Sequence, residues 1–421
     1  MVKKKKKVSR RKIFIVVFIL LLMAVLISLS IYFFINRDKN EKEVTPVTVE
    51  EKKKEPVEKT TSFSFIGLGD ALLHPAVYQD ANTGKVGSDG YYIYDFHNMF
   101  SYVSDFIKPY DLKFYNQETI IGGKSRGLSG YPCFNSPDEI GLNLVDIGFN
   151  IVNLASNHTM DKGINAISYS TDFWQKQKGV LSVGSYKSKA QRDSIEIREV
   201  NGITYAVLSY TYGTNGIPVP SGYDYMVNVW PDDSRSAFEA YKPTVKRDVE
   251  SVRDKVDVLM VSMHWGTEYQ LGATNWYQQE AAKYLSSLGV DVIIGTHPHV
   301  VQPVEFVGDT LVIYSLGNMV SSQAINYDYS SYKKYYRLVG GVAAFTVNKK
   351  TVDGETKEIS ISDVKADVVY NYYSSSRTNF KIYPFTKLNN NILYNYKDVY
   401  EYYKKQLNPK GDSRIKVGFL E

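Results

Sequence analysis

The hydrophobic positions of this chain of 421 residues follow two patterns, and the first is a single long apolar run. Residues 13–35 hold 23 positions without a charge. At about 1.5 Å per residue, a helix over this run is roughly 35 Å long, which is enough to cross a membrane core of about 30 Å. A cleaved signal peptide is the alternative, but its apolar region is normally about 7–15 residues long and ends in small residues. This run is longer and ends in Tyr-Phe-Phe-Ile, so the pattern favours an uncleaved transmembrane helix.

The second pattern begins at Thr61 and consists of short apolar runs that end in polar or glycine-rich residues. Near-continuous hydrophobicity over such short lengths predicts strands that are covered on both faces. Segments with helical periodicity lie between several of these runs, so the alternation predicts an α/β arrangement. The predicted strands cover residues 63–70, 112–118, 150–158, 204–211, 256–265, 290–299 and 310–318. The predicted helices cover residues 94–108, 137–148, 163–177, 236–254 and 275–289.

After the last of these runs the pattern changes again. Residues 340–370 alternate at period two around turn residues, which predicts an antiparallel hairpin. The chain beyond Arg377 is polar and rich in tyrosine, and it holds one helical segment at residues 396–406. The pattern therefore divides the chain into five parts. They are a basic segment at 1–12, a transmembrane helix at 13–35, a charged linker at 36–60, an α/β domain with its hairpin at 61–372, and a tyrosine-rich C-terminal extension at 373–421.

The charge of the chain is distributed unevenly, and this affects where each part is expected to lie. The first twelve residues carry eight basic side chains and no acidic one, whereas the remainder is slightly acidic although the net charge is +5. Basic residues that precede a membrane span stay in the cytoplasm. We therefore expect a single-pass protein of the cell membrane whose N-terminus is cytoplasmic and whose main domain is extracellular. A slightly acidic domain offers no basic surface to nucleic acid, so we exclude that partner.

The composition narrows the chemistry further. The single cysteine, Cys133, excludes an intrachain disulfide and a multi-cysteine metal site, and we expect it to be a small core residue rather than a nucleophile. Tyrosine is abundant, with 35 residues, which fits either a β-rich surface or a platform that binds a polymer. The linker has many charges and no aromatic residue, so we expect it to be a solvated spacer.

Histidine is scarce, and its placement points to a site. Five of the six histidines follow the ends of predicted strands, together with two carboxylates and three asparagines. In an open α/β sheet the carboxyl ends of the strands converge on one crevice, where ligands bind. The sixth histidine, His97, lies inside the predicted helix 94–108, and we expect it to be a core residue bonded to backbone. The residues expected at the crevice are Asp70, His74, Asn116, Glu118, Asn157, His158, His264, His297, His299 and Asn318.

These residue types are suited to binding divalent cations. Neutral imidazole and carboxylate oxygen are ligands for Zn, Mn, Fe and similar ions. Two such ions about 3.5–4 Å apart need a bridging carboxylate and separate ligands on either side. We expect two divalent ions (Mn, Fe or Zn), with His158 as the general acid and with His74, Asn116 and Asn318 as candidates for a metal or substrate contact. The metal ligands expected from the pattern are Asp70, Glu118, Asn157, His264, His297 and His299.

The segment "GTHPHVVQ" carries two of these ligands. His297 and His299 are separated only by Pro298. Their spacing of two residues predicts an extended segment with both rings on one face, so that one loop reaches both ions. The proline fixes its own φ angle and stiffens the loop.

Six motifs in this order resemble one known family. They are "GLGDALLH", "YNQETIIGG", "NLASNHTMDKG", "MHWGTEY", "GTHPHVVQ" and "YSLGN". Together they resemble the CapA-type poly-γ-glutamate capsule synthesis proteins, a branch of the calcineurin-like metallophosphatase superfamily, over about residues 63–320. The resemblance implies a four-layer α/β/β/α sandwich with a dimetal site between its sheets. It also implies a membrane protein that assists the synthesis, export or anchoring of an anionic capsule polymer, beside other capsule synthesis membrane subunits.

The resemblance carries over residue by residue, with two departures. The residues that match metal or catalytic positions of the superfamily are Asp70, Glu118, Asn157, His158, His264, His297 and His299. Glu118 stands where the superfamily has a bridging aspartate. Leu72 stands where the superfamily has the histidine of an opening Asp-x-His motif, and the nearest histidine is His74.

Two alternatives to a capsule hydrolase remain open from the sequence. One is a metal-dependent phosphoesterase that acts on other cell-envelope material. The other is a non-catalytic scaffold that binds polymer and retains the ligands, which the abundant tyrosine and the altered first motif favour. Metal analysis and turnover of a phosphoester before and after His264→Ala separate an enzyme from a scaffold.

Overall fold

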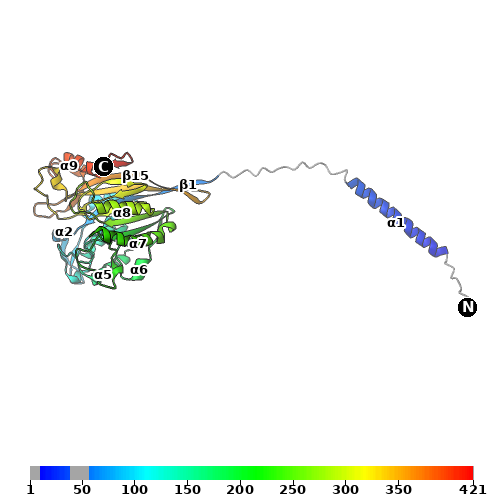
Figure 1. The fold of residues 1–421 in the computed structure, drawn as a ribbon, viewed down its shortest axis with the longest axis horizontal. Coiled ribbons are helices and arrows are strands. Elements are labelled where there is room, and N and C mark those ends of the chain that lie inside the picture. Colours follow the sequence, from blue (N-terminus) through cyan, green and yellow to red (C-terminus); the bar gives the residue numbers. More distant parts are fainter. Residues whose placement is uncertain (1–9, 38–55, 421) are drawn as a thin grey trace. The chain divides into compact units, whose positions relative to one another are not determined.

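The computed structural model describes residues 10–37 and 56–420 of the chain. These residues belong to two compact units, Met1–Pro56 and Val57–Glu421. The described part of the first unit is essentially helix α1 (Arg10–Arg37), within which Ile13–Arg37 is long and apolar enough to cross a membrane (Figure 1). This matches the transmembrane helix expected at 13–35. Residues 1–9 and 38–55, which hold most of the expected basic segment and linker, lie outside the described residues.

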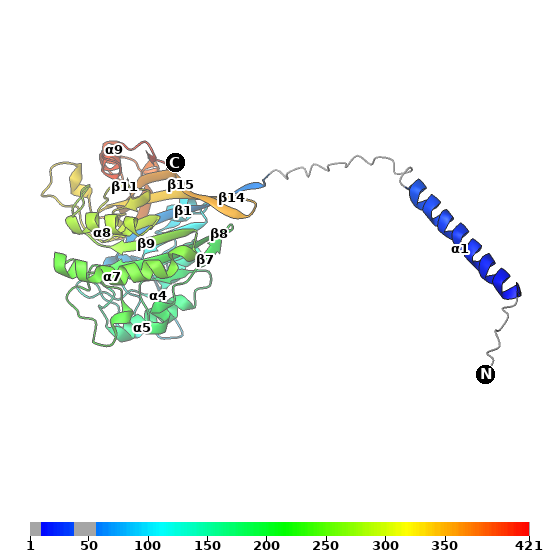
Figure 2. The ribbon, with the colours of Figure 1, turned by 45° about the vertical axis from the view of Figure 1, so that its right-hand side comes forward.

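The first large sheet of the second unit is built around β1. This strand pairs in parallel with β4 and antiparallel with β14, so the hairpin β14–β15 runs alongside it (Figure 2). From one edge to the other, the sheet consists of β16 (Lys381–Pro384), β15 (Glu355–Tyr372), β14 (Val339–Val352), β1 (Glu58–Ala71), β4 (Leu112–Asn116), β5 (Ile151–Asn153) and β6 (Leu181–Val183), with β13 (Asn318–Val320) beside β1 and β17 (Ile415–Val417) beside β15.

The second large sheet is parallel at its centre and antiparallel at its edges. All seven residues of β9 are buried, which explains why this strand reads as a continuous apolar run. The order of the sheet is β11 (Val304–Val307), β12 (Thr310–Ile313), β10 (Val292–Thr296), β9 (Val258–His264), β8 (Ile203–Thr211) and β7 (Arg198–Val200). A separate small hairpin consists of β2 (Asn82–Val86) and β3 (Tyr92–Tyr94).

The two sheets pack face to face between layers of helices. Phe65 and Phe114 of the first sheet belong to one buried cluster with Tyr205, Met260 and Ile294 of the second. The helices on the outer face of the first sheet are α2 (Pro75–Asp80), α3 (Ser101–Ile107), α4 (Asp138–Asp146) and α5 (Ile164–Gln175). The helices on the outer face of the second sheet are α7 (Arg235–Val252) and α8 (Trp276–Ser287) (Figure 2). The short α6 (Lys189–Asp193) lies beside α7, where its Arg192 pairs with Asp248. The expected four-layer α/β/β/α arrangement is confirmed.

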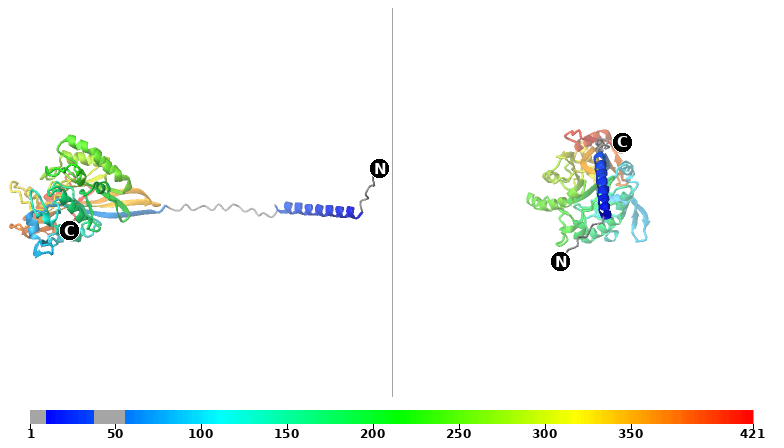
Figure 3. Two further views of the ribbon diagram at one scale, coloured as in Figure 1. Left: turned by 90° about the horizontal axis from the view of Figure 1, so that it is seen from below. Right: turned by 90° about the vertical axis from the view of Figure 1, so that its right-hand side faces the viewer.

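The ends of the domain extend further than the sequence pattern indicated. Strand β1 begins at Glu58, so residues 58–60 of the expected linker pair with β14. At the other end, β16 and β17 both pair with β15, and α9 (Tyr396–Leu407) buries Val399 and Tyr403 against the same core. The red C-terminal segment accordingly lies next to the orange strands of the hairpin (Figure 3). The tyrosine-rich extension is therefore part of the domain. The sequence pattern did not indicate this, because the polar composition of the extension obscures the one apolar face of α9.

Two smaller expectations are wrong. His97 is exposed and lies before α3, with its Nδ1 2.7 Å from Asp95 Oδ1. The backbone N–H of His97 donates to the same Asp95 oxygen at 3.0 Å, and such a local side-chain bond competes with helix formation at this point. Cys133 is partly exposed rather than a core residue.

A close approach between two glycines sets the position of Asp70. A Cβ atom added at Gly69 would lie 1.8 Å from the carbonyl oxygen of Gly317. The backbone N–H of Asp70 donates to that same oxygen at 2.8 Å, and Asp70 is in register with Asn318 of β13. The missing side chain at Gly69 therefore allows β13 to lie against the end of β1.

The substitution Gly69→Ala is expected to destabilise the domain. The added methyl group would force β13 away from β1, and overpacking of this kind costs about 3 kcal/mol. Chemical denaturation of the full chain in detergent measures the loss in the free energy of unfolding. Gly213→Ala is the matched control, because a Cβ there meets no atom within 4 Å, and it should leave stability within about 0.5 kcal/mol. Equal stability of the two variants would contradict the role given to Gly69.

Candidate metal centre

Most of the residues expected at a common crevice lie at the carboxyl ends of strands from both sheets or in the loops that follow them. Asp70 lies near the end of β1, His264 is the last residue of β9, and Asn318 is the first residue of β13. The others lie at the end of β4 or in the loops that follow β1, β4, β5 and β10. The members that are buried are Asp70, Asn116, Glu118, Asn157, His158, His264, His297, His299 and Asn318.

Five of these residues form two ligand groups that share Glu118. One group is Asp70, Glu118 and His299, and the other is Glu118, His264 and His297; in each group the ligand atoms lie within 4.8 Å of one another. Glu118 Oε1 is 3.5 Å from His299 Nε2 and 4.0 Å from His264 Nε2. His299 Nδ1 is 3.2 Å from Asp70 Oδ2. A carboxylate between two sets of ligands is the arrangement that a pair of cations requires.

The donor atoms in this cluster fit a cation better than they fit one another. Both carboxylate oxygens of Glu118 and the Nδ1 atom of His297 are buried without a hydrogen-bond partner among the described residues. A buried carboxylate without compensation is costly, and it is usually paired or bound to metal. The residues present therefore fit a metal site.

The electrostatics of the metal-free cluster point the same way. Burial, and the nearby Asp70, raise the pKa of Glu118 well above its ordinary value. Burial and neighbouring histidines lower the pKa of His264 and His297, which keeps both rings in the neutral form that binds metal. Burial acts to lower the pKa of His299, but the carboxylates of Glu118 and Asp70 overcome it and raise that pKa to about 9. A positive charge between these two carboxylates is therefore favoured.

Asparagine side chains hold the ligands in place. Asn116 Nδ2 donates to Asp70 Oδ1 at 2.8 Å, and Asn116 Oδ1 accepts from Asn153 at 2.7 Å. Asn157 Oδ1 lies 2.9 Å from His264 Nε2, so its amide oxygen sits beside the second ligand group. Asn116 thus orients Asp70, whereas Asn157 lies beside the second ligand group.

His158 makes a close pair with an aspartate that the sequence reading passed over. His158 Nδ1 lies 2.7 Å from Asp161 Oδ2, and the backbone N–H of Phe134 donates to the same oxygen at 2.6 Å. Asn215 Nδ2 contacts the His158 ring at 3.3 Å. Asp161 stands inside the quoted motif "NLASNHTMDKG", so its spacing from His158 was an available signal. Asn215 is 57 positions away from His158, and no local pattern links them.

His74 lies at the edge of the cluster rather than in either ligand group. It precedes α2, and its Nδ1 accepts from the backbone N–H of Ser322 at 3.4 Å. Burial and then the charge of His299 are the main causes that lower the pKa of His74 to about 4. Its ring also meets the Phe134 ring edge-on at 5.4 Å. A neutral His74 is thus placed beside the candidate metal site.

The backbone at the His-Pro-His segment differs from the expectation. His297 and His299 have φ angles of 97° and 59°, so the segment is left-handed at both histidines and not extended. Such angles are strained for residues with a side chain and are found where function constrains the backbone. The result is that the two rings join different ligand groups through the shared Glu118.

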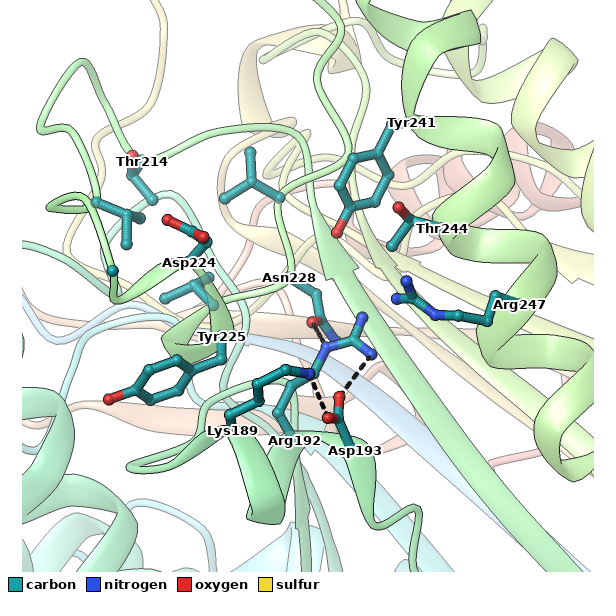
Figure 4. A pocket seen from close by; sticks show the side chains of 14 residues that line it. Lys189, Arg192, Asp193, Thr214, Asp224, Tyr225, Asn228, Tyr241, Thr244 and Arg247 are labelled. Carbon is teal, nitrogen blue, oxygen red and sulfur yellow. Dashed lines mark hydrogen bonds and ion pairs between the residues drawn. The ribbon is translucent and has the colours of Figure 1, made fainter.

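A cavity of about 680 Å³ lies beside the cluster and not within it. Figure 4 shows Arg192 bonded to Asn228 and Lys189 close to Asp193 in this cavity. Thr214 lines it, and the next residue is Asn215, which contacts His158. None of the residues of the two ligand groups lines this cavity, so the cavity is not the candidate metal site.

The fold and the ligand cluster together define a metallophosphatase-like α/β protein. Beyond that class, the chain belongs to the family described as "Bacterial capsule synthesis protein PGA_cap", whose model matches residues 64–323. The resemblance drawn from the six motifs is therefore confirmed.

Curated relatives and a solved structure were also found. The chain is 32% identical over 183 residues to "PGA biosynthesis protein CapA" of Bacillus subtilis, which is 43% of this chain and 44% of that protein. It is 27% identical over 179 residues to "Capsule biosynthesis protein CapA" of Bacillus anthracis, which is 42% of this chain and 41% of that protein. The matches thus span less than half of either relative. Among solved structures, the calcineurin-like phosphoesterase YfkN from Bacillus subtilis matches 82% of this chain and 100% of its own chain. The TM-score of this match is 0.39 and the sequence identity is 15%.

Divalent metal is expected to stabilise the domain. An ion that binds only the folded chain at a hundred times its Kd adds about 2.7 kcal/mol, so Mn²⁺ should raise the Tm of the chelator-treated protein. Glu118→Gln removes the shared charge and should lower both the metal content and the Tm increase by more than half. Elemental analysis and a thermal melt measure these quantities. Glu139→Gln, whose carboxylate pairs with Lys124 away from the cluster, should behave like the wild type. Unchanged metal content in Glu118→Gln would contradict the shared-ligand assignment.

Proposed function

We propose that this protein is a membrane-anchored, outward-facing, metal-dependent hydrolase of the phosphoesterase type that assists the synthesis, export or anchoring of an anionic capsule polymer. The observation that carries the proposal is Glu118, a buried carboxylate shared by two ligand groups and without a hydrogen-bond partner among the described residues. Membership of the capsule synthesis family supports the biological setting.

Two divalent ions (Mn, Fe or Zn) are proposed for the two ligand groups. Asp70 and His299 would hold one ion, His264 and His297 the other, and Glu118 both. The Asn157 amide oxygen lies beside His264 and completes the second set. Bound divalent ions of this kind lower the pKa of water to roughly 7 and neutralise the charge on a phosphoryl group.

His158 is proposed as the general acid that protonates the leaving oxygen. It borders the ligand groups but is a member of neither, so its ring is free to donate a proton. Asp161 accepts from His158 Nδ1–H at 2.7 Å, so the proton that the doubly protonated ring gives to the leaving oxygen is the one on Nε2. Phe134 packs edge-on against the same ring at 4.7 Å and limits its rotation.

The membrane orientation follows from the charge around α1. The basic residues before the apolar run would remain in the cytoplasm and place the domain outside. Partners of such a protein are the membrane, the polymer or its phosphoester precursors, and other membrane subunits of capsule synthesis.

A second candidate function is a non-catalytic scaffold that binds polymer. Tyr131, Tyr327 and Tyr394 favour it, because their rings are between 72% and 81% exposed and offer flat surfaces for contact. A scaffold of this kind would bind polymer without any dependence on the ligand groups.

Turnover of a phosphoester tests the hydrolase. The Mn²⁺-loaded full chain in detergent should hydrolyse p-nitrophenyl phosphate or its diester, and His264→Ala should abolish this activity. Asp161→Asn should lower kcat by about tenfold to a hundredfold with unchanged metal content, because Asp161 positions His158 and only part of the general acid catalysis is lost. His97→Ala is the matched control, since His97 is an exposed histidine outside the cluster. An inert wild type with the same behaviour as His264→Ala supports the scaffold instead.

The single cysteine allows the orientation to be tested without engineering a label site. Cys133 is partly exposed in the main domain and is the only cysteine of the chain. A maleimide that does not cross the cell membrane is expected to label Cys133 on intact cells. The cell envelope must let the reagent reach the outer face of the cell membrane. Cys133→Ser should remain unlabelled. Labelling that occurs only after lysis would place the domain in the cytoplasm.

A further inference from the structure

Two arginines outside the residues matched by the family model lie beside the candidate metal centre. The model match ends at residue 323, whereas Arg337 precedes β14 and Arg377 belongs to the C-terminal extension. Both reach the end of the site that holds Asp70 and His299.

Arg337 is held against that end by aromatic rings. Its guanidinium carbon lies 4.5 Å from the centroid of Tyr269 and 5.1 Å from that of Tyr336. The Tyr269 ring is 6.0 Å from the ring of His299. The backbone carbonyl of Arg337 also accepts from Asn318 Nδ2 at 3.0 Å. Arg337 is thus separated from a metal-ligand residue by a single tyrosine ring.

Arg377 reaches the same end through Ser322. Its Nη1 donates to Ser322 Oγ at 3.2 Å, and the backbone N–H of Ser322 donates to His74 Nδ1. Arg377 has a positive φ angle of 56°, and the loop around it is closed by bonds between Ser374 and Thr378. The C-terminal extension therefore presents an arginine beside His74 from a tightly folded loop.

The charges of both arginines are uncompensated. Among the described residues, no carboxylate lies within 4.0 Å of Arg337 or Arg377. The guanidinium of Arg337 makes no hydrogen bond to a described residue, and its Nε is buried without a partner. Glu268 stands next to Tyr269 in the sequence but is exposed and pairs with neither arginine. Arginine is the side chain best suited to recognise carboxylate or phosphate through its planar fork.

The cavity of Figure 4 does not offer comparable cations. Its Arg192 is paired with Asp248, its Arg247 lies 3.1 Å from the same carboxylate, and its Lys189 is paired with Asp193. The basic side chains there are already satisfied by acidic neighbours. The unpaired cations lie beside the ligand groups instead.

We propose that Arg337 and Arg377 form an anion-recognition pair at the Asp70–His299 end of the site, which binds an anionic group of the substrate next to the group that reacts. The substrate is then a chain or molecule with at least two anionic groups, phosphate or carboxylate. This inference deepens the proposed hydrolase function, and it rests on that function because it takes the bound anion to be part of a substrate. It gives the C-terminal extension a direct part in specificity.

Calorimetry on the Mn²⁺-loaded full chain in detergent tests the pair with two probes, inorganic phosphate and a γ-glutamyl oligomer. Arg337→Gln and Arg377→Gln are each expected to weaken the binding of at least one probe about tenfold, because a charged hydrogen-bonded contact is lost. The probe that responds distinguishes phosphate from carboxylate. Arg337→Lys and Arg377→Lys keep the charge but lose the fork, and they should show a smaller loss; they also replace any glutamine variant that does not fold.

Arg235→Gln is the matched control. Arg235 is exposed like Arg377 and stacks on an aromatic ring, that of Trp276, as Arg337 stacks on Tyr269, and no carboxylate of the described residues lies within 4.0 Å of it. It should bind both probes like the wild type. Unchanged binding of both probes by the Arg337 and Arg377 variants, or an equal loss in Arg235→Gln, would overturn the inference.

The binding measurement does not depend on turnover, so a result can contradict the hydrolase or the anion site without contradicting the other. An inert chain that still shows the arginine-dependent loss contradicts the hydrolase and keeps the anion site. An active chain without that loss keeps the hydrolase and removes the anion site. In an active chain, both arginine variants are expected to raise KM more than they lower kcat, as positioning through a remote anionic group requires.

Discussion

The carboxylate of Glu118 is the constraint on which the rest of the site depends. It is buried between two groups of ligands, and neither of its oxygens has a hydrogen-bond partner among the described residues. Burial of such a group is unfavourable unless a positive charge compensates it. In the metal-free chain His299 partly fills this role, which is why its pKa is raised to about 9. The surrounding neutral histidines can compensate only through a cation that they bind together.

The fold satisfies this constraint by placing strand ends from both sheets next to each other. Asp70 comes from the first sheet and His264 from the second, and the two strands that carry them are far apart in the chain. Asn116 and Asn153 link β4 and β5 by side-chain hydrogen bonds and hold Asp70 in orientation. The close contact of Gly69 with Gly317 then places β13 against β1. The ligand set is therefore built from buried side chains at strand ends and in the loops that directly follow them.

The sequence pattern predicted the structure correctly where a whole strand is buried. It failed where local hydrogen bonds or contacts between distant residues determine the conformation. The apolar run of β9 predicted a doubly covered strand, and the structure places His264, at its end, in one of the two candidate ligand groups. His97 was misplaced because its bond to Asp95 interrupts a helical pattern. The left-handed backbone at His297 and His299 could not be read from residue types, since the spacing alone suits an extended segment. Asn215 reaches His158 only through tertiary packing.

By itself, the sequence determined the apolar helix, the alternation of strands and helices, and the residue types that gather at strand ends, because these depend on periodicity and side-chain chemistry. Only the tertiary structure decided that Glu118 is shared between two ligand groups. It also decided that the C-terminal extension joins the first sheet and carries Arg377 to the site. The contacts of Glu118 with His264 and His299 join distant positions of the chain, and they exist only once the two sheets have packed.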